Sequence, residues 1–155
     1  MRYFITFACY GAHLHGDESG SVDRGHNLFG GRTLEADPQR ARAERRSMNQ
    51  AHYEMDSDSR AIVLRTLAEV CSHRGWNLLA AHVRTNHVHV IVEAEVQPEK
   101  VMNDFKAYAS RALNRLDGRH GSTRWRWRDQ DVGEAIRSVV EQQGEPMAVF
   151  LGDAP

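Results

Sequence analysis

Two histidines alternate with valines along the apolar segment from Asn86 to Val92, and this alternation restricts the fold more than any other part of the sequence. Successive side chains of a β-strand point to opposite faces, so His87 and His89 should share one face, roughly 6.6 Å apart along the strand. The valines then need a hydrophobic layer on the other face. Two interpretations follow. Either the histidines simply lie on a half-exposed face of the sheet, or they are two ligands for one divalent metal ion.

The segments around this strand predict an antiparallel sheet with helices on one face. Aromatic and β-branched residues mark the other strands, and Thr85–Asn86 forms the turn of a hairpin. Apolar residues at helical spacing mark the helices. The expected strands are 3–10, 76–84, 86–92, 123–128 and 146–151, and the expected helices are 38–48, 57–73, 98–116 and 131–143. The order strand, helix, strand, strand, helix, strand is the ferredoxin-like α+β plan.

The chain of 155 residues is long enough for one domain with its own core, so residues 1–155 are expected to fold as a unit. Within it, the polar, glycine-punctuated stretch 11–55 is a long insertion after the first strand, and 122–151 adds an Arg/Trp strand and a helix. No apolar run approaches the roughly 20 residues of a membrane span, and no signal peptide precedes the first strand. We therefore expect a cytoplasmic protein with no membrane partner.

Cys9 and Cys71 are isolated from each other, one in an expected strand and one in an expected helix. Their positions are typical of small buried hydrophobic residues, and they form no recognisable redox or metal motif.

Basic residues are concentrated between positions 106 and 128, where Asp117 is the only acidic residue. The net charge of −1 argues mildly against a nucleic-acid partner. A basic run can be a solvated face, but arginines interleaved with tryptophans are also typical of a surface that binds the DNA backbone and stacks on bases. The candidate DNA-binding residues are Lys106, Arg111, Arg115, Arg124, Trp125, Arg126, Trp127 and Arg128.

Tyr108 lies at the edge of the apolar stripe of the expected helix 98–116. Asp104 precedes it by one turn, and Arg111 and Arg115 follow on the same flank. A tyrosine at such a boundary usually packs its ring on the core and exposes its hydroxyl. The basic neighbours leave a functional role open as well.

Together these segments resemble the HUH endonucleases, and within them the small single-tyrosine transposases of insertion sequences and their REP-associated relatives. The residues that carry the resemblance are Asn86–Val92 for a metal-binding strand, and Phe105–Tyr108 with Leu113–Arg115 for a nucleophile-bearing helix. The similarity includes the opening strand and covers most of residues 1–128. It implies an HUH core of ferredoxin-like fold.

The resemblance also implies metal-assisted cleavage and rejoining of single-stranded DNA. His87 and His89 are then expected to hold Mg²⁺ or Mn²⁺, and Tyr108 to attack the phosphorus and form a 5′-phosphotyrosine. Members of this family act as homodimers on DNA hairpins, often with one subunit's tyrosine facing the other's histidines.

The chain departs from the family pattern at one position. A third metal ligand commonly follows the tyrosine by one helical turn, and that position is Ala112, which has no ligand atom. Asp104, one turn before the tyrosine, and His120, in the loop that follows, are the candidates to replace it.

Two other functions fit parts of the sequence. A domesticated relative without catalysis would bind structured single-stranded DNA or repeat hairpins through the Arg/Trp segment. A different metal enzyme would join the histidine pair to His13, His15 or His26, and an all-histidine tetrahedral site would favour zinc.

Overall fold

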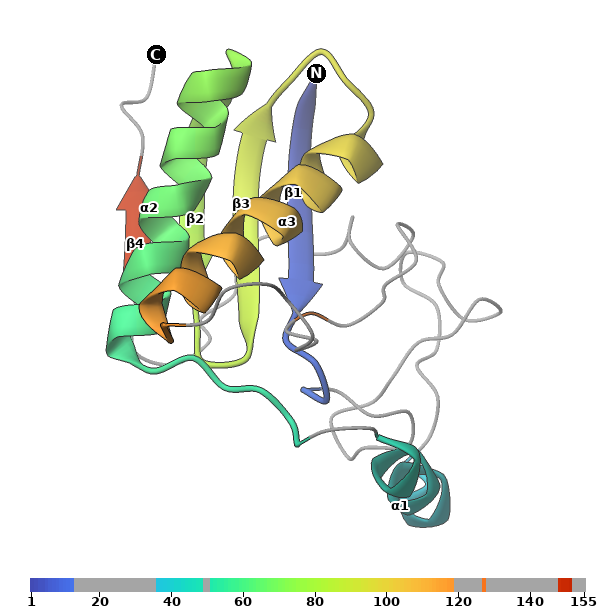
Figure 1. Cartoon of the computed structure of the whole chain (residues 1–155). Coiled ribbons are helices and arrows are strands. Elements are labelled where there is room, and N and C mark those ends of the chain that lie inside the picture. The colour runs from blue at the N-terminus through green and yellow to red at the C-terminus, as the bar shows by residue number, and fades with distance from the viewer. Residues whose placement is uncertain (13–35, 49–50, 119–126, 128–147, 152–155) are drawn as a thin grey trace.

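Four strands form one antiparallel sheet in the computed structural model, which describes residues 1–12, 36–48, 51–118, 127 and 148–151. The sheet order is β1–β3–β2–β4, with β1 at Arg2–Ala8, β2 at Asn77–Val83, β3 at His87–Glu93 and β4 at Ala148–Leu151. Helices α2 (Ser57–Arg74) and α3 (Pro98–Leu116) cover one face of the sheet, which is turned toward the viewer in Figure 1. Helix α1 (Pro38–Ser47) lies away from the sheet, beyond the end of β1 (Figure 1). The predicted α+β class with an antiparallel sheet is confirmed.

The core lies between the sheet and helices α2 and α3. Every second residue of β3 is buried, so Val88, Val90 and Val92 are at most 1% exposed, while His87 and His89, which alternate with them, are half-buried. Helix α3 meets these valines with its apolar stripe, which includes Phe105 and Ala109, both fully buried. The predicted division of the strand into a valine face and a histidine face is therefore confirmed.

Side-chain and glycine caps set the limits of the first two helices. The Asp37 carboxylate accepts hydrogen bonds from the backbone of the first turn of α1, and Pro38 begins the helix, as predicted. Asp56 caps α2 in the same way, accepting from the backbone N–H of Ser59 at 2.8 Å. Helix α2 ends at Gly75, whose φ of 69° lies in the left-handed region that favours glycine.

Strands β2 and β3 form the predicted hairpin, but β2 contains a bulge. The ladder shifts register between Leu78 and Ala80, so Leu79 is an extra residue with no partner of its own on β3. Beyond the bulge the ladder is regular, and it places His82 directly opposite His89.

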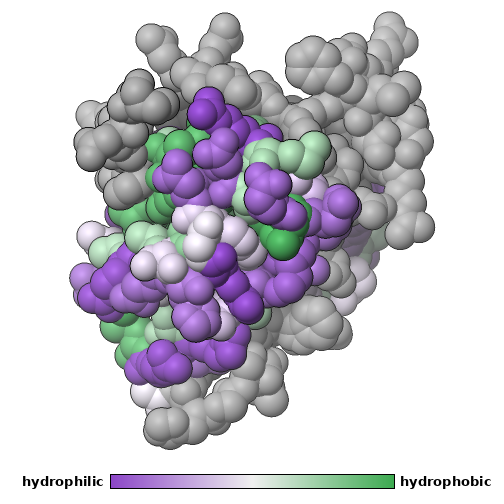
Figure 2. Space-filling view, turned by 90° about the horizontal axis from the view of Figure 1, so that it is seen from above, coloured by the Kyte–Doolittle hydropathy of each residue, from purple (hydrophilic) through white to green (hydrophobic). Residues whose placement is uncertain are grey.

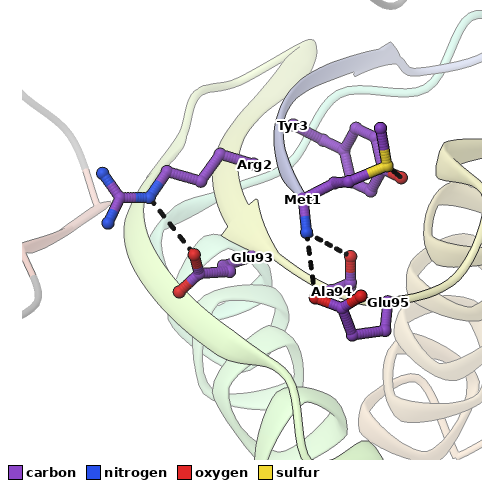
Figure 3. A network of polar contacts seen from close by, with 6 residues as sticks. All are labelled: Met1, Arg2, Tyr3, Glu93, Ala94 and Glu95. Carbon is purple, nitrogen blue, oxygen red and sulfur yellow. Dashed lines mark hydrogen bonds and ion pairs between the residues drawn. The ribbon is translucent and has the colours of Figure 1, made fainter.

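Polar contacts hold the start of β1 against the end of β3 (Figure 3). The Met1 ammonium group donates to the Ala94 carbonyl and to the Glu95 carboxylate, at 3.1 Å in each case. Arg2 Nε donates to the Glu93 carboxylate at 3.4 Å. These pairs are largely exposed and stabilise the fold only weakly. Their main effect is to favour the observed register, in which Arg2 lies opposite Glu93.

Neither cysteine forms a disulfide, and both are buried as predicted, with Cys9 at 0% and Cys71 at 2% exposure. Burial raises the pKa of the Cys71 thiol to about 12. The Cys71 thiol therefore stays protonated at neutral pH, which makes it a packing group with little reactivity.

The later elements are described only in part. Of the expected strand 123–128, the structure describes Trp127, which forms an isolated antiparallel bridge with Cys9. The expected last strand is present as β4, which pairs with β2 at the edge of the sheet. The expected helix 131–143 and most of the insertion 11–55 lie outside the described residues.

The surface seen from above is largely hydrophilic over the described residues, with hydrophobic residues in separate patches (Figure 2). The large apolar side chains that are exposed in this part of the chain are Met1, Val96 and Leu116. Within the same residues, no helix combines the length and the apolar character that crossing a membrane requires.

Candidate active site

His87 and His89 lie on the face of the sheet that points away from α2 and α3. We call it the histidine face and define it by Phe4, Thr6, His82, His87 and His89. The ring centroids of His87 and His89 are 4.6 Å apart, and the rings are inclined by 71°. Phe4 stacks on the His89 ring at 5.7 Å and restricts its movement. The structure thus brings the predicted histidine pair together on a rigid strand.

A polar contact at Nδ1 orients each imidazole. Asn86 Oδ1 lies 2.6 Å from Nδ1 of His87, and because a carboxamide oxygen only accepts, this nitrogen donates. In the neutral ring, Nε2 of His87 then carries the lone pair that a metal ligand requires. Thr6 Oγ1 lies 2.8 Å from Nδ1 of His89 and holds that ring in a comparable way. Such contacts to the second ring nitrogen are usual for metal-ligating histidines.

Burial lowers the pKa of two histidines on the histidine face, His89 and His82. Burial, with smaller contributions from the neighbouring His82 and Arg84, lowers the pKa of His89 to about 4. Burial also lowers the pKa of His82, again with a smaller contribution from Arg84. At neutral pH both imidazoles are therefore in the uncharged form, which is the form that binds metal ions.

Strand β2 and the residue that follows it, Arg84, supply two residues to this region that were absent from the sequence-based candidates. His82 is the ladder partner of His89. The backbone N–H of Arg84 donates to the His87 carbonyl at 2.9 Å, which continues the ladder by one more pair. The predicted hairpin could have identified both residues, because a two-residue turn determines which residues of the two strands lie opposite each other.

Tyr108 lies in the helical layer, on the opposite side of the sheet from the histidine pair. Its half-buried ring packs against the core and lines a pocket of about 270 Å³ between α2 and α3, together with Arg111, Ala112 and Arg115. The Arg111 guanidinium lies 4.3 Å from the centroid of the Tyr108 ring. Because the sheet separates the two groups, a single chain does not bring this phenol and the histidine pair together.

Asp104 belongs to the helical layer as well. Its carboxylate pairs with Arg74 of α2 at 3.0 Å and with Lys100 at 2.6 Å, and its side chain is 13% exposed. The structure therefore does not bring this candidate third ligand to the histidine pair, and His120 lies outside the described residues. In the described part of the chain, no three His, Cys, Asp or Glu side chains are grouped so as to hold a metal ion.

Trp127 is a core residue, which argues against its predicted role in stacking on DNA bases. Its side chain is 8% exposed and packs edge-on against Phe7 at 5.1 Å. Its indole N–H donates to the Lys106 carbonyl at 3.0 Å and to the Ser110 hydroxyl at 2.8 Å. A ring enclosed in this way offers no face to a nucleobase. The other candidates of this segment, Arg124, Trp125, Arg126 and Arg128, lie outside the described residues.

A family model described as "Transposase IS200 like" matches residues 45–131. This span is more than half of the chain and includes the hairpin, the histidine pair and helix α3. No curated protein and no solved structure matches the chain.

Proposed function

Because the chain belongs to the family of IS200-like transposases, we propose that it cleaves and rejoins single-stranded DNA at the histidine face. Membership of the family implies a DNA-processing enzyme that takes part in transposition. The observation that carries the rest of the proposal is the pair of oriented imidazoles, His87 and His89, side by side on one strand.

The two imidazoles fit a divalent metal ion as two of its ligands. Each ring is held by a polar contact at Nδ1, and the lowered pKa of His89 keeps that ring available at neutral pH. Mg²⁺ or Mn²⁺ bound there would polarise the phosphate that is cleaved and offset the charge on its oxygens. Imidazole ligands suit Mn²⁺ better than Mg²⁺, which prefers oxygen ligands.

Tyr108 is the proposed nucleophile, and its place in the helical layer requires that it act on the histidine face of a second copy of the chain. Its phenol oxygen forms a bond to phosphorus while the bond from phosphorus to the 3′-oxygen breaks. The phenol proton passes to solvent, and the departing 3′-oxygen takes up a proton. The Arg111 guanidinium lies 4.3 Å from the centroid of the ring and places a cation beside the proposed nucleophile. The 5′-phosphotyrosine keeps a reactive ester bond, so rejoining needs no ATP.

Formation of a covalent adduct tests the chemistry. The protein is incubated with Mn²⁺ and a single-stranded hairpin oligonucleotide, and the expected product is a protein–DNA species that resists SDS. Tyr108→Phe and His89→Ala should abolish the adduct, whereas the matched control Tyr3→Phe should retain it. An adduct that persists in Tyr108→Phe refutes this assignment of the nucleophile. Tight hairpin binding by a wild-type chain that forms no adduct refutes cleavage altogether.

Mixing two inactive variants tests whether the site is shared between copies. His89→Ala and Tyr108→Phe chains, inactive alone, should together give about a quarter of the wild-type adduct. Random exchange makes half of the dimers mixed, and each mixed dimer has one intact site. The DNA should be attached to the His89→Ala chain, which keeps Tyr108. A mixture that gives no adduct, although the wild-type chain is active, contradicts the shared site.

A further inference from the structure

We propose that Arg84 and His82 form a phosphate-binding row beside the histidine pair, and that the phosphodiester on which the protein acts is bound there. That this phosphate belongs to DNA rests on the proposed function. The binding of a phosphate group at these two residues can be tested separately.

The ladder between β2 and β3 brings the row and the histidine pair together. His82 lies opposite His89, and Arg84 lies opposite His87 through the backbone hydrogen bond of 2.9 Å. Directly opposite residues of antiparallel strands have Cβ atoms about 5 Å apart. Val83, which separates the two residues of the row, is fully buried on the core side. Strand alternation therefore directs His82 to the histidine face, and the hydrogen bond from Arg84 to His87 extends the same alternation to Arg84, one residue beyond β2.

An electrostatic observation agrees with this placement. After burial, the charge of Arg84 contributes to the lowered pKa of His82 and, with His82, to that of His89. The charge of Arg84 thus acts on imidazoles of two neighbouring strands, as expected for a side chain on the histidine face. Arg84 is therefore the permanent cation of a face whose two neighbouring imidazoles are neutral at pH 7.

The chemistry of the row suits a phosphate. A guanidinium offers a planar fork of N–H donors that matches two phosphate oxygens, and its charge does not depend on pH in the neutral range. Neutral His82 keeps one ring N–H that can donate to a third oxygen. Strand β1 adds no opposing charge, because the residues opposite His89 and His87 are Thr6 and Ala8. An anion at this position would lie beside the histidine pair, where the proposed metal ion would act on it.

Titration of the metal-free protein with inorganic phosphate tests the row directly. The imidazole NMR signals of His82 and His89 should shift to saturation in the wild-type chain. Arg84→Gln should weaken phosphate binding about tenfold or more, since hydrogen bonds to a charged group contribute this much. The phosphate affinity of Arg84→Lys should lie between those of wild type and Arg84→Gln, because an ammonium group keeps the charge but lacks the planar fork of donors. Arg65→Gln makes the same charge change in α2, where Arg65 pairs with Glu69, and should leave binding unchanged.

Each outcome decides for or against the row. Equal phosphate affinity in Arg84→Gln and wild type overturns it, and so do wild-type imidazole signals that do not move. The Arg84→Lys chain separates loss of binding from loss of folding. If phosphate binding depends on Arg84 in a protein that never forms a DNA adduct, the row is supported and the transposase chemistry is refuted. If Arg84→Gln binds phosphate and forms the adduct as wild type does, the row alone is refuted.

Discussion

The hydroxyl oxygen of Thr6 lies 2.8 Å from Nδ1 of His89, although the two residues are 83 positions apart in the sequence. The contact crosses from β1 to β3, where the two residues are ladder partners. The first strand of the chain therefore does more than extend the sheet. It supplies the side chain that orients one of the two proposed metal ligands, so formation of the site depends on the correct pairing of β1.

Thr6→Val should weaken Mn²⁺ binding by about tenfold to a hundredfold, because loss of such a partner leaves the ligand ring without a fixed orientation. Thr6→Ser keeps the hydroxyl and should restore most of the affinity. Calorimetric titration of the metal-free protein with Mn²⁺ measures the effect. Thr66→Val is the matched control, since the Thr66 hydroxyl donates to the Ile62 carbonyl within α2. Unchanged affinity in Thr6→Val would show that the contact does not orient a ligand.

The free energy of unfolding should fall as the pH is lowered from about 6.5 toward 4. His89 has a pKa of about 4 when folded, against an ordinary value of 6.5, chiefly because it is buried. Between these pH values the unfolded chain binds a proton that the folded chain does not, which favours unfolding. Urea denaturation at several pH values measures this, and His89→Gln should flatten the dependence. His73→Gln, at an exposed histidine of α2, should leave it unchanged. The same slope in wild type and His89→Gln would contradict the prediction.

Asp104→Asn should leave Mn²⁺ affinity unchanged and lower the free energy of unfolding by about 1–2 kcal/mol. The carboxylate joins α3 to α2 through its 3.0 Å contact with Arg74, and this contact is partly shielded from solvent. Calorimetric Mn²⁺ titration and urea denaturation together separate the two roles. A large loss of Mn²⁺ affinity would restore Asp104 as a candidate ligand.

Trp127→Ala should destabilise the fold by about 3–5 kcal/mol, the range for truncation of a large buried aromatic residue. Its ring fills the space against Phe7, and its N–H satisfies two acceptors on α3. Trp127→Phe should cost less, because most of the ring volume remains. Thermal unfolding measures both effects, and the hairpin affinity of the folded Trp127→Phe protein should match that of wild type. A specific loss of hairpin affinity without loss of stability would favour the original DNA-stacking role.

Much of the fold follows from local patterns. The cap formed by Asp37 and Pro38, the apolar stripe of 98–116 and the hairpin at Thr85–Asn86 all correspond to observed elements. Each depends on residues close together in the sequence, where helix capping and strand alternation are determined. The bulge at Leu79 was not foreseen, because no residue there is typical of a bulge.

The candidate site was predicted less completely than the fold, because it depends on which face of the sheet the helices cover. The apolar stripe of α3 requires the valine face of β3, so the helix carrying Tyr108 is placed away from the histidines of its own chain. The apolar stripe of α3 and the alternation of β3 together predict this separation of Tyr108 from the histidines, although neither pattern predicts it alone. Trp127 is a similar case, because a residue that alternates with arginines along a strand faces the opposite side, and Trp127 is buried there.

The extra residue of the β2 bulge, Leu79, could be lost without moving His82 away from His89. Because Leu79 has no ladder partner, a version of the chain without it would form an uninterrupted ladder from Leu78 to Val83. Leu78 would still point inward, and His82 would still lie across from His89. A deletion on the other side of His82 would instead rotate Arg84 to the interior. The bulge thus divides β2 into a part that tolerates a change in length and a part whose length is fixed.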